Sequence, residues 1–105
     1  MEIHHHQHED THYLALHGAF DVLGARSFDK KIASLKTNGG LSLVISFAGV
    51  PYISSQGAPT LETLAGQARE GSFRVTFSQL NEFPRENLKL MGFGGWSFVD
   101  EVPGA

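Results

Sequence analysis

Two adjacent serines, Ser54 and Ser55, stand where an apolar run gives way to a helical pattern, in the segment VPYISSQGAPTL. A serine hydroxyl at the start of a helix can accept a hydrogen bond from a free backbone N–H of the first turn. A phosphate on such a serine would face the positive end of the helix dipole. It would add about −1.5 to −2 charges to the surface. The pair is therefore a helix cap, a phosphorylation switch, or both.

Histidines are the second group with potential chemistry, because His4, His5, His6 and His8 fall within five positions. Neutral imidazoles bind zinc, copper or nickel. However, adjacent histidines bind metal loosely, and no Asp, Glu or Cys stands at an obvious ligand spacing. We therefore favour a first strand with imidazoles on its solvent face, or an added tag. We predict neither a metal site nor a cofactor.

Composition excludes several classes of protein. The chain has 105 residues, of which 41% are apolar and 18% charged, as in one globular domain. A net charge of −3 disfavours a nucleic-acid or anionic-membrane partner. Cysteine is absent, and no apolar run approaches the ~18 residues of a membrane helix. We expect a cytoplasmic protein that does not insert into a membrane and is a monomer or weak dimer.

Catalytic motifs are missing from the sequence. It contains no GxxxxGK[ST] loop, no GxGxxG between a strand and a helix, and no HExxH or GxSxG. Ser55, His17 and Asp21 could form a Ser-His-Asp set, but such a trio can be chosen from most chains. We therefore predict that the protein is not an enzyme.

The elements that must position the serines alternate between strand and helix. Residues 12–18 and 73–80 alternate like strands, and 41–47 are almost wholly apolar, as in a strand covered on both faces. Helical spacing predicts a helix over 22–37, capped by Asp21, with Ala25, Phe28, Ile32 and Leu35 buried.

The later elements continue the alternation. A second helix is predicted over 54–71, with an apolar stripe of Leu61, Leu64, Ala65 and Ala68. A third begins near Pro84, with Leu88 and Met91 inward, before a short strand at 96–99. The class is α/β (α+β-like), with a mixed β-sheet and about three α-helices. We divide the chain into a polar segment (1–11), one domain (12–100) and a loose tail (101–105).

Three motifs in this order resemble a STAS domain: the G-x-F-D turn at Gly18–Asp21, the LVI-x-x-x-x-V-x-Y-I strand and loop, and Ser54–Gly57 as S-S-x-G. The closest type is the single-domain bacterial anti-anti-sigma factor (anti-sigma factor antagonist), over about residues 12 to 98. The resemblance implies a STAS-type mixed sheet and a partner-switching cycle. The antagonist binds an anti-sigma factor serine kinase of GHKL type, phosphorylation releases it, and a PP2C-type phosphatase resets it.

The resemblance also implies which residues act. The family's acceptor follows an Asp in a D-S-[ST]-G loop, which maps phosphorylation to Ser55, with Ser54 less favoured. Ser54 itself holds the Asp position, Gln56 the second hydroxyl position, and Pro59 the first turns of the helix. The expected partner-binding residues are Phe20, Asp21, Val50, Tyr52, Ser54, Ser55, Gln56 and Gly57.

An alternative function keeps the fold but not the switch. Some STAS domains are non-phosphorylated scaffolds or subunits of a larger assembly, such as a stress-sensing complex or a lipid-transport ABC system. In that case Ser55 acts only as a helix cap. The aromatics Phe93, Trp96 and Phe98 are assigned to the edge of the core rather than to a dimer contact.

Overall fold

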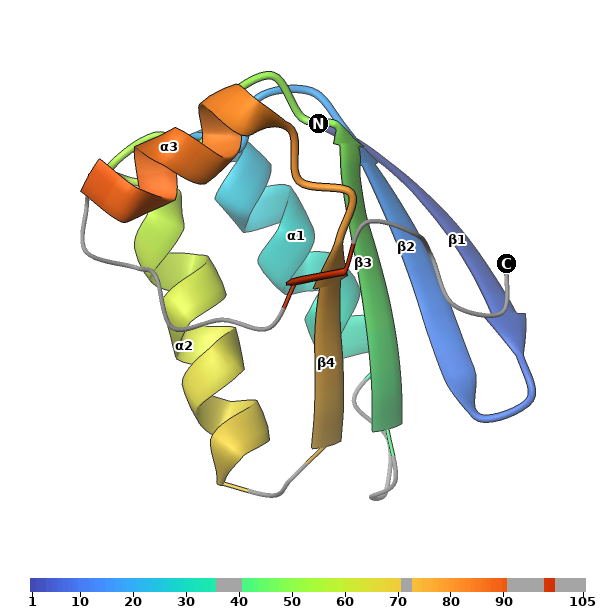
Figure 1. The fold of residues 1–105 in the computed structure, drawn as a ribbon. Coiled ribbons are helices and arrows are strands. Elements are labelled where there is room, and N and C mark those ends of the chain that lie inside the picture. The colour runs from blue at the N-terminus through green and yellow to red at the C-terminus, as the bar shows by residue number, and fades with distance from the viewer. Residues whose placement is uncertain (36–40, 71–72, 91–97, 100–105) are drawn as a thin grey trace.

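The computed structural model describes residues 1–35, 41–70, 73–90 and 98–99 (Figure 1). In these ranges the chain forms, in order, β1 (Glu2–His8), β2 (Thr11–His17), α1 (Val22–Leu35), β3 (Leu41–Gly49), α2 (Ala58–Arg69), β4 (Phe73–Ser78), α3 (Glu82–Leu90) and β5 (Phe98–Val99). The predicted tail (101–105) lies outside the described residues, and so do Met91, Phe93 and Trp96. The histidine-rich segment forms β1.

The strands form one mixed sheet in the order β1-β2-β3-β4-β5. β1 and β2 pair antiparallel as a hairpin, and the other neighbouring pairs are parallel. α1 and α2 cover one face of the sheet, and α3 lies across the end where β3 and β4 finish (Figure 1). The predicted mixed sheet with three helices is confirmed.

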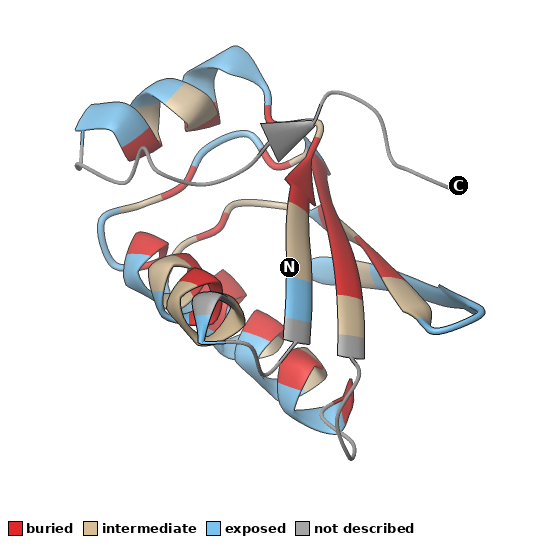
Figure 2. Cartoon of the chain, turned by 60° about the horizontal axis from the view of Figure 1, so that its bottom comes forward, coloured by how far each residue is buried: buried red, intermediate tan, exposed pale blue. Residues whose placement is uncertain are grey.

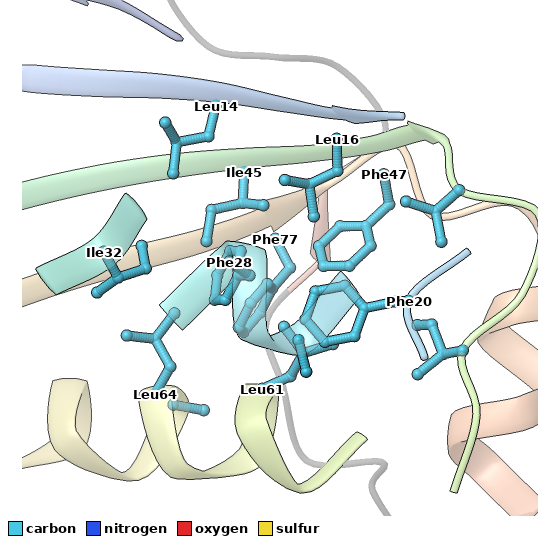
Figure 3. Close-up of a cluster of buried hydrophobic side chains, with 14 of the residues drawn as sticks. Leu14, Leu16, Phe20, Phe28, Ile32, Ile45, Phe47, Leu61, Leu64 and Phe77 are labelled. Carbon is cyan, nitrogen blue, oxygen red and sulfur yellow. The ribbon is translucent and has the colours of Figure 1, made fainter. Parts of the chain in front are cut away.

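The core lies between the sheet and the two long helices (Figure 3). Leu14 and Leu16 of β2, with Ile45 and Phe47 of β3, point toward the helices, and each is nearly inaccessible to solvent. The helices contribute the buried side chains of Phe28, Ile32, Leu61 and Leu64 to the same core. Burial of each such side chain contributes about 1.5–3 kcal/mol. These contacts fix where each strand and helix ends, and therefore where the loops between them lie.

β3 is the central strand, as its apolar run predicts. Leu43 to Phe47 are all buried, so side chains on both faces of the strand are covered. The polar member of this run, Ser46, donates from its hydroxyl to Gln79 Oε1 at 2.6 Å. Burial of that hydroxyl is therefore compensated by a hydrogen bond.

The start of α1 agrees with the prediction, whereas the start of α2 differs from it. Asp21 Oδ1 accepts from the Gly24 N–H at 2.9 Å, so Asp21 caps α1 as predicted. The predicted second helix started at Ser54, but α2 starts at Ala58, with Pro59 in its first turn. Residues 54–57 form a separate turn before it. The local pattern does not distinguish this turn from a first helical turn, because both use the same cap chemistry.

Loss of the Phe28 ring should cost about 3–5 kcal/mol of unfolding free energy in Phe28→Ala, because the surrounding core closes the cavity only in part. Phe83 is 63% exposed on α3, so Phe83→Ala is a matched control with an expected change of about 0.5 kcal/mol or less. Urea unfolding of the two variants measures the difference. Equal losses would contradict this account of the core.

Candidate functional site

The segment Val50–Gly57 joins β3 to α2 and lies along the residues that join β2 to α1. Phe20 and Ile53 form a parallel bridge between the two segments. The Phe20 N–H donates to the Tyr52 carbonyl at 3.0 Å, and the Ser54 N–H donates to the Phe20 carbonyl at 3.0 Å. The two segments thus hold each other through their backbones, as adjacent strands do.

Two asparagines hold the same region from the other side. Asn87 of α3 accepts from the Ile53 N–H through Oδ1 at 3.2 Å. Asn81, just before α3, donates from Nδ2 to the Ala48 carbonyl at 3.0 Å. Sequence reasoning missed both residues, because they stand more than thirty positions from their partners and match no local motif. Together with Phe20 they fix the backbone course of the loop.

Ser54 takes the capping role within the turn. Its hydroxyl oxygen accepts from the Gly57 N–H at 3.0 Å, and its carbonyl accepts from the Ala58 N–H at 3.0 Å. Gly57, immediately before α2, has helical backbone angles and no side-chain cap of its own. The hydroxyl of Ser54 therefore stabilises the turn through a hydrogen bond to the backbone.

Ser55 has a different environment from its neighbour. It is exposed, as is Gln56, and within the described ranges its hydroxyl makes no hydrogen bond. The expectation that either serine could cap the helix is therefore resolved in favour of Ser54. The Ser55 hydroxyl is accessible to another protein at no cost to the turn.

Three of the eight expected partner-binding residues are buried. Phe20 and Val50 have no exposed surface, and Gly57 is also buried. The Phe20 ring packs edge-on against Phe28 at 5.3 Å between centroids. A Cβ on Gly57 would overlap the Phe20 carbonyl oxygen. The expectation that these three contact a partner directly does not fit the structure, and they support the loop from beneath.

Several exposed side chains of the Val50–Gly57 segment and of the first residues of α1 are apolar. Tyr52 is 40% exposed, and Asp21 is half-buried. Val22 and Leu23, which open α1 directly after Asp21, are 45% and 64% exposed. Sequence reasoning did not single them out, although apolar residues off the buried stripe of a helix are a recognisable signal. We call Asp21, Val22, Leu23, Tyr52, Ser55 and Gln56 the loop surface.

Over residues 1–35, 41–70, 73–90 and 98–99, no three His, Cys, Asp or Glu side chains are grouped so that they could hold a metal ion. None of the described helices combines the length and apolar character needed to cross a bilayer.

Comparison with known proteins identifies the family. The family model described as "Mlab, STAS domain" matches residues 3–100, so the chain belongs to the STAS domain family. No curated protein sequence matches it.

Solved structures show the same fold at low identity. A proposed anti-sigma factor antagonist from Thermotoga maritima superposes with a TM-score of 0.82 at 15% identity, over 95% of this chain and 87% of that one. The anti-sigma factor antagonist SpoIIAA in its unphosphorylated form gives 0.76 at 15% identity, over 97% and 90%. The STAS-type architecture is therefore confirmed.

The two serines should differ in their effect on stability. Ser54→Ala removes the acceptor of the Gly57 N–H and should cost about 0.5–2 kcal/mol. Ser55→Ala should change the unfolding free energy by about 0.5 kcal/mol or less, because its hydroxyl has no partner among the described residues. Urea titrations of the two variants test this, and a larger loss at Ser55 would reverse the assignment.

Gly57→Ala should destabilise the domain by about 1–3 kcal/mol, because the new methyl group meets the backbone of Phe20 rather than a flexible side chain. The neighbouring Gln56→Ala, at an exposed position, should be close to neutral. Thermal unfolding of both variants measures the difference. A neutral Gly57→Ala would mean that the loop does not rest on Phe20 as closely as the structure shows.

Proposed function

We propose that this protein is an anti-sigma factor antagonist. It is a non-enzymatic module that binds an anti-sigma factor serine kinase of GHKL type through the loop surface, and phosphorylation of Ser55 releases it. The observation that carries the proposal is the contrast between the two serines. Ser54 is bonded within the turn, whereas Ser55 presents an exposed, unbonded hydroxyl on a backbone held from both sides.

The position of Ser55 suits a phosphate. It lies three residues before the first residue of α2, on the side of the helix where the dipole is positive and N–H groups lack helical partners. The capping bonds of the turn come from Ser54, so modification of Ser55 breaks none of them. A phosphate should therefore leave the fold intact and act on the partner.

The surroundings of Ser55 explain how a phosphate would release a partner. Tyr52, Val22 and Leu23 offer apolar area that a partner would cover. A phosphate buried within such a contact loses its hydration, which opposes binding. Because Ser55 is exposed in the free protein, a PP2C-type phosphatase can reach it and restore binding. A kinase cycle that consumes ATP places the protein in the cytoplasm.

A second candidate is a STAS subunit that binds its partner without a phosphorylation cycle. Two observations favour it: the matching family model is the Mlab type, and Ser54 replaces the Asp that precedes the acceptor in the antagonist motif. Under this proposal the loop surface would bind a constant neighbour, in a lipid-transport ABC system or a stress-sensing complex. Ser55 would then stay unmodified.

Mass spectrometry of the protein isolated from resting and stressed host cells separates the two candidates. Trypsin releases residues 37–69 as one peptide, so fragmentation must distinguish Ser54 from Ser55. Phosphate on Ser55 that changes with condition supports the antagonist. Its absence in every condition, with the host kinase active on other proteins, favours the constant subunit.

Binding to the cognate kinase then tests the switch itself. Ser55→Asp should weaken binding at least tenfold, or about 1.4 kcal/mol, with a nearly unchanged melting temperature. Ser55→Ala should bind like the unmodified protein. Ser34→Asp adds the same charge at an exposed position in the last turn of α1 and should not affect binding. Equal affinity of Ser55→Asp and Ser34→Asp would exclude the proposed switch.

A further inference from the structure

All six histidines of the chain lie in the β1–β2 hairpin, at positions 4, 5, 6, 8, 12 and 17. Several of their rings contact one another or an aromatic ring across the two strands. His4 meets His17 edge-on at 4.8 Å between centroids, and His6 stacks on Tyr13 at 4.8 Å. Histidine is the side chain that changes charge between pH 5 and 8. The hairpin thus carries the main charge change of the protein in this range.

The closest contact joins His5 of β1 to His12 of β2. Nε2 of His5 and Nδ1 of His12 are 2.8 Å apart, a hydrogen-bond distance. Such a bond needs one proton between the two nitrogens, so one ring donates and the other accepts. It survives a first added proton, which leaves one ring neutral. A second proton places two cationic rings, each with only donors, at the same contact.

The groups around His5 also disfavour its charge. Burial lowers the pKa of His5, and the neighbouring Lys31 of α1, His12 and His6 lower it further. β3, the next strand of the sheet, has no titratable side chain. Because its pKa is lower in the folded state, the unfolded strand binds the proton more readily. The resulting stability is full above the ordinary histidine pKa of about 6.5 and is lost as the pH falls below it.

Acidic residues of the hairpin only partly offset these charges. Glu2 Oε1 lies 3.0 Å from His4 Nε2, and Glu9 and Asp10 lie in the turn. Three acidic residues face six histidines, so full protonation changes the hairpin from about three net negative to three net positive charges. His4 and His17, like His5 and His12, are diagonal neighbours across the two strands, close enough for like charges to repel.

β1 is also the strand with the least support from the core. It bonds to β2 alone, and no strand covers its outer edge in the described part of the chain. Most of the β1 side chains are exposed, as the pale blue end of the hairpin in Figure 2 shows. Of the residues in β1, Ile3 is the one that packs partly against the core. Regions with few buried contacts open at low free-energy cost.

We propose that β1 is a pH-released edge strand: protonation of both rings of the His5–His12 pair at mildly acidic pH separates it from β2 while the rest of the domain stays folded. Release would uncover the backbone N–H and C=O groups of β2, which can then pair with another extended segment. This inference does not depend on the proposed function, because the loop surface contains no histidine.

Amide hydrogen exchange of the full chain at pH 7.5, 6.5 and 5.5 tests the proposal, after correction for the intrinsic pH dependence of exchange. Protection of the β1 amides should fall about tenfold or more over this range, whereas β3 and β4 should keep theirs. The double variant His5→Gln with His12→Gln keeps a neutral hydrogen-bonding pair and should retain β1 protection at pH 5.5. His8→Gln removes an exposed histidine outside the ring contacts and should behave like the parent.

Three results would overturn the proposal. These are unchanged β1 protection at pH 5.5, a parallel loss in β3 that marks general acid unfolding, and full pH dependence in a folded double variant. Should the double variant not fold, NMR titration of the histidine rings in the parent protein decides. His5 should titrate below the ordinary histidine range, and an ordinary or raised pKa for His5 refutes the mechanism.

Discussion

Phe20 connects the core of this domain to its candidate site. Its ring is fully buried against Phe28 and Phe47, while its backbone N–H and carbonyl pair with Tyr52 and Ser54. The carbonyl also leaves no space for a side chain at residue 57. The loop before α2 therefore cannot move far without disturbing the packing between the sheet and the helices. A rigid loop of this kind can present one hydroxyl in a constant position.

Under the proposed function, the two neighbouring serines divide two tasks that a single residue could not perform together. A hydroxyl that accepts a backbone N–H is partly withdrawn from solvent, whereas a phosphate acceptor must be exposed. Ser54 stabilises the turn and Ser55 remains accessible. The exposed apolar residues Val22, Leu23 and Tyr52 of the loop surface offer area for a protein partner. Under the proposed function, charge is added at the contact and not to the fold, so switching and stability are separate.

β1 and the Gly18–Asp21 segment differ in how firmly they are attached to the rest of the domain. The Gly18–Asp21 segment is tied to the core and to the loop, whereas β1 is an exposed edge strand held by β2 and by histidine contacts. β2 connects them, because it begins in the hairpin and ends beside the candidate site. Under the two proposals, the charge changes of the hairpin and of the loop would fall on different segments of the chain.

The sequence by itself determined the elements and the family. Period-two alternation and helical spacing predicted the strands and helices, because these patterns report which face of an element is buried. The Asp21 cap was also readable, since its partner lies three residues away. Only the tertiary structure decided that Phe20, Val50 and Gly57 are buried, that α2 starts after the Ser54 turn, that the His5 and His12 rings meet across the hairpin, and that Asn81 and Asn87 hold distant segments. Such contacts depend on how elements pack, and a local pattern carries no information about partners that are remote along the chain.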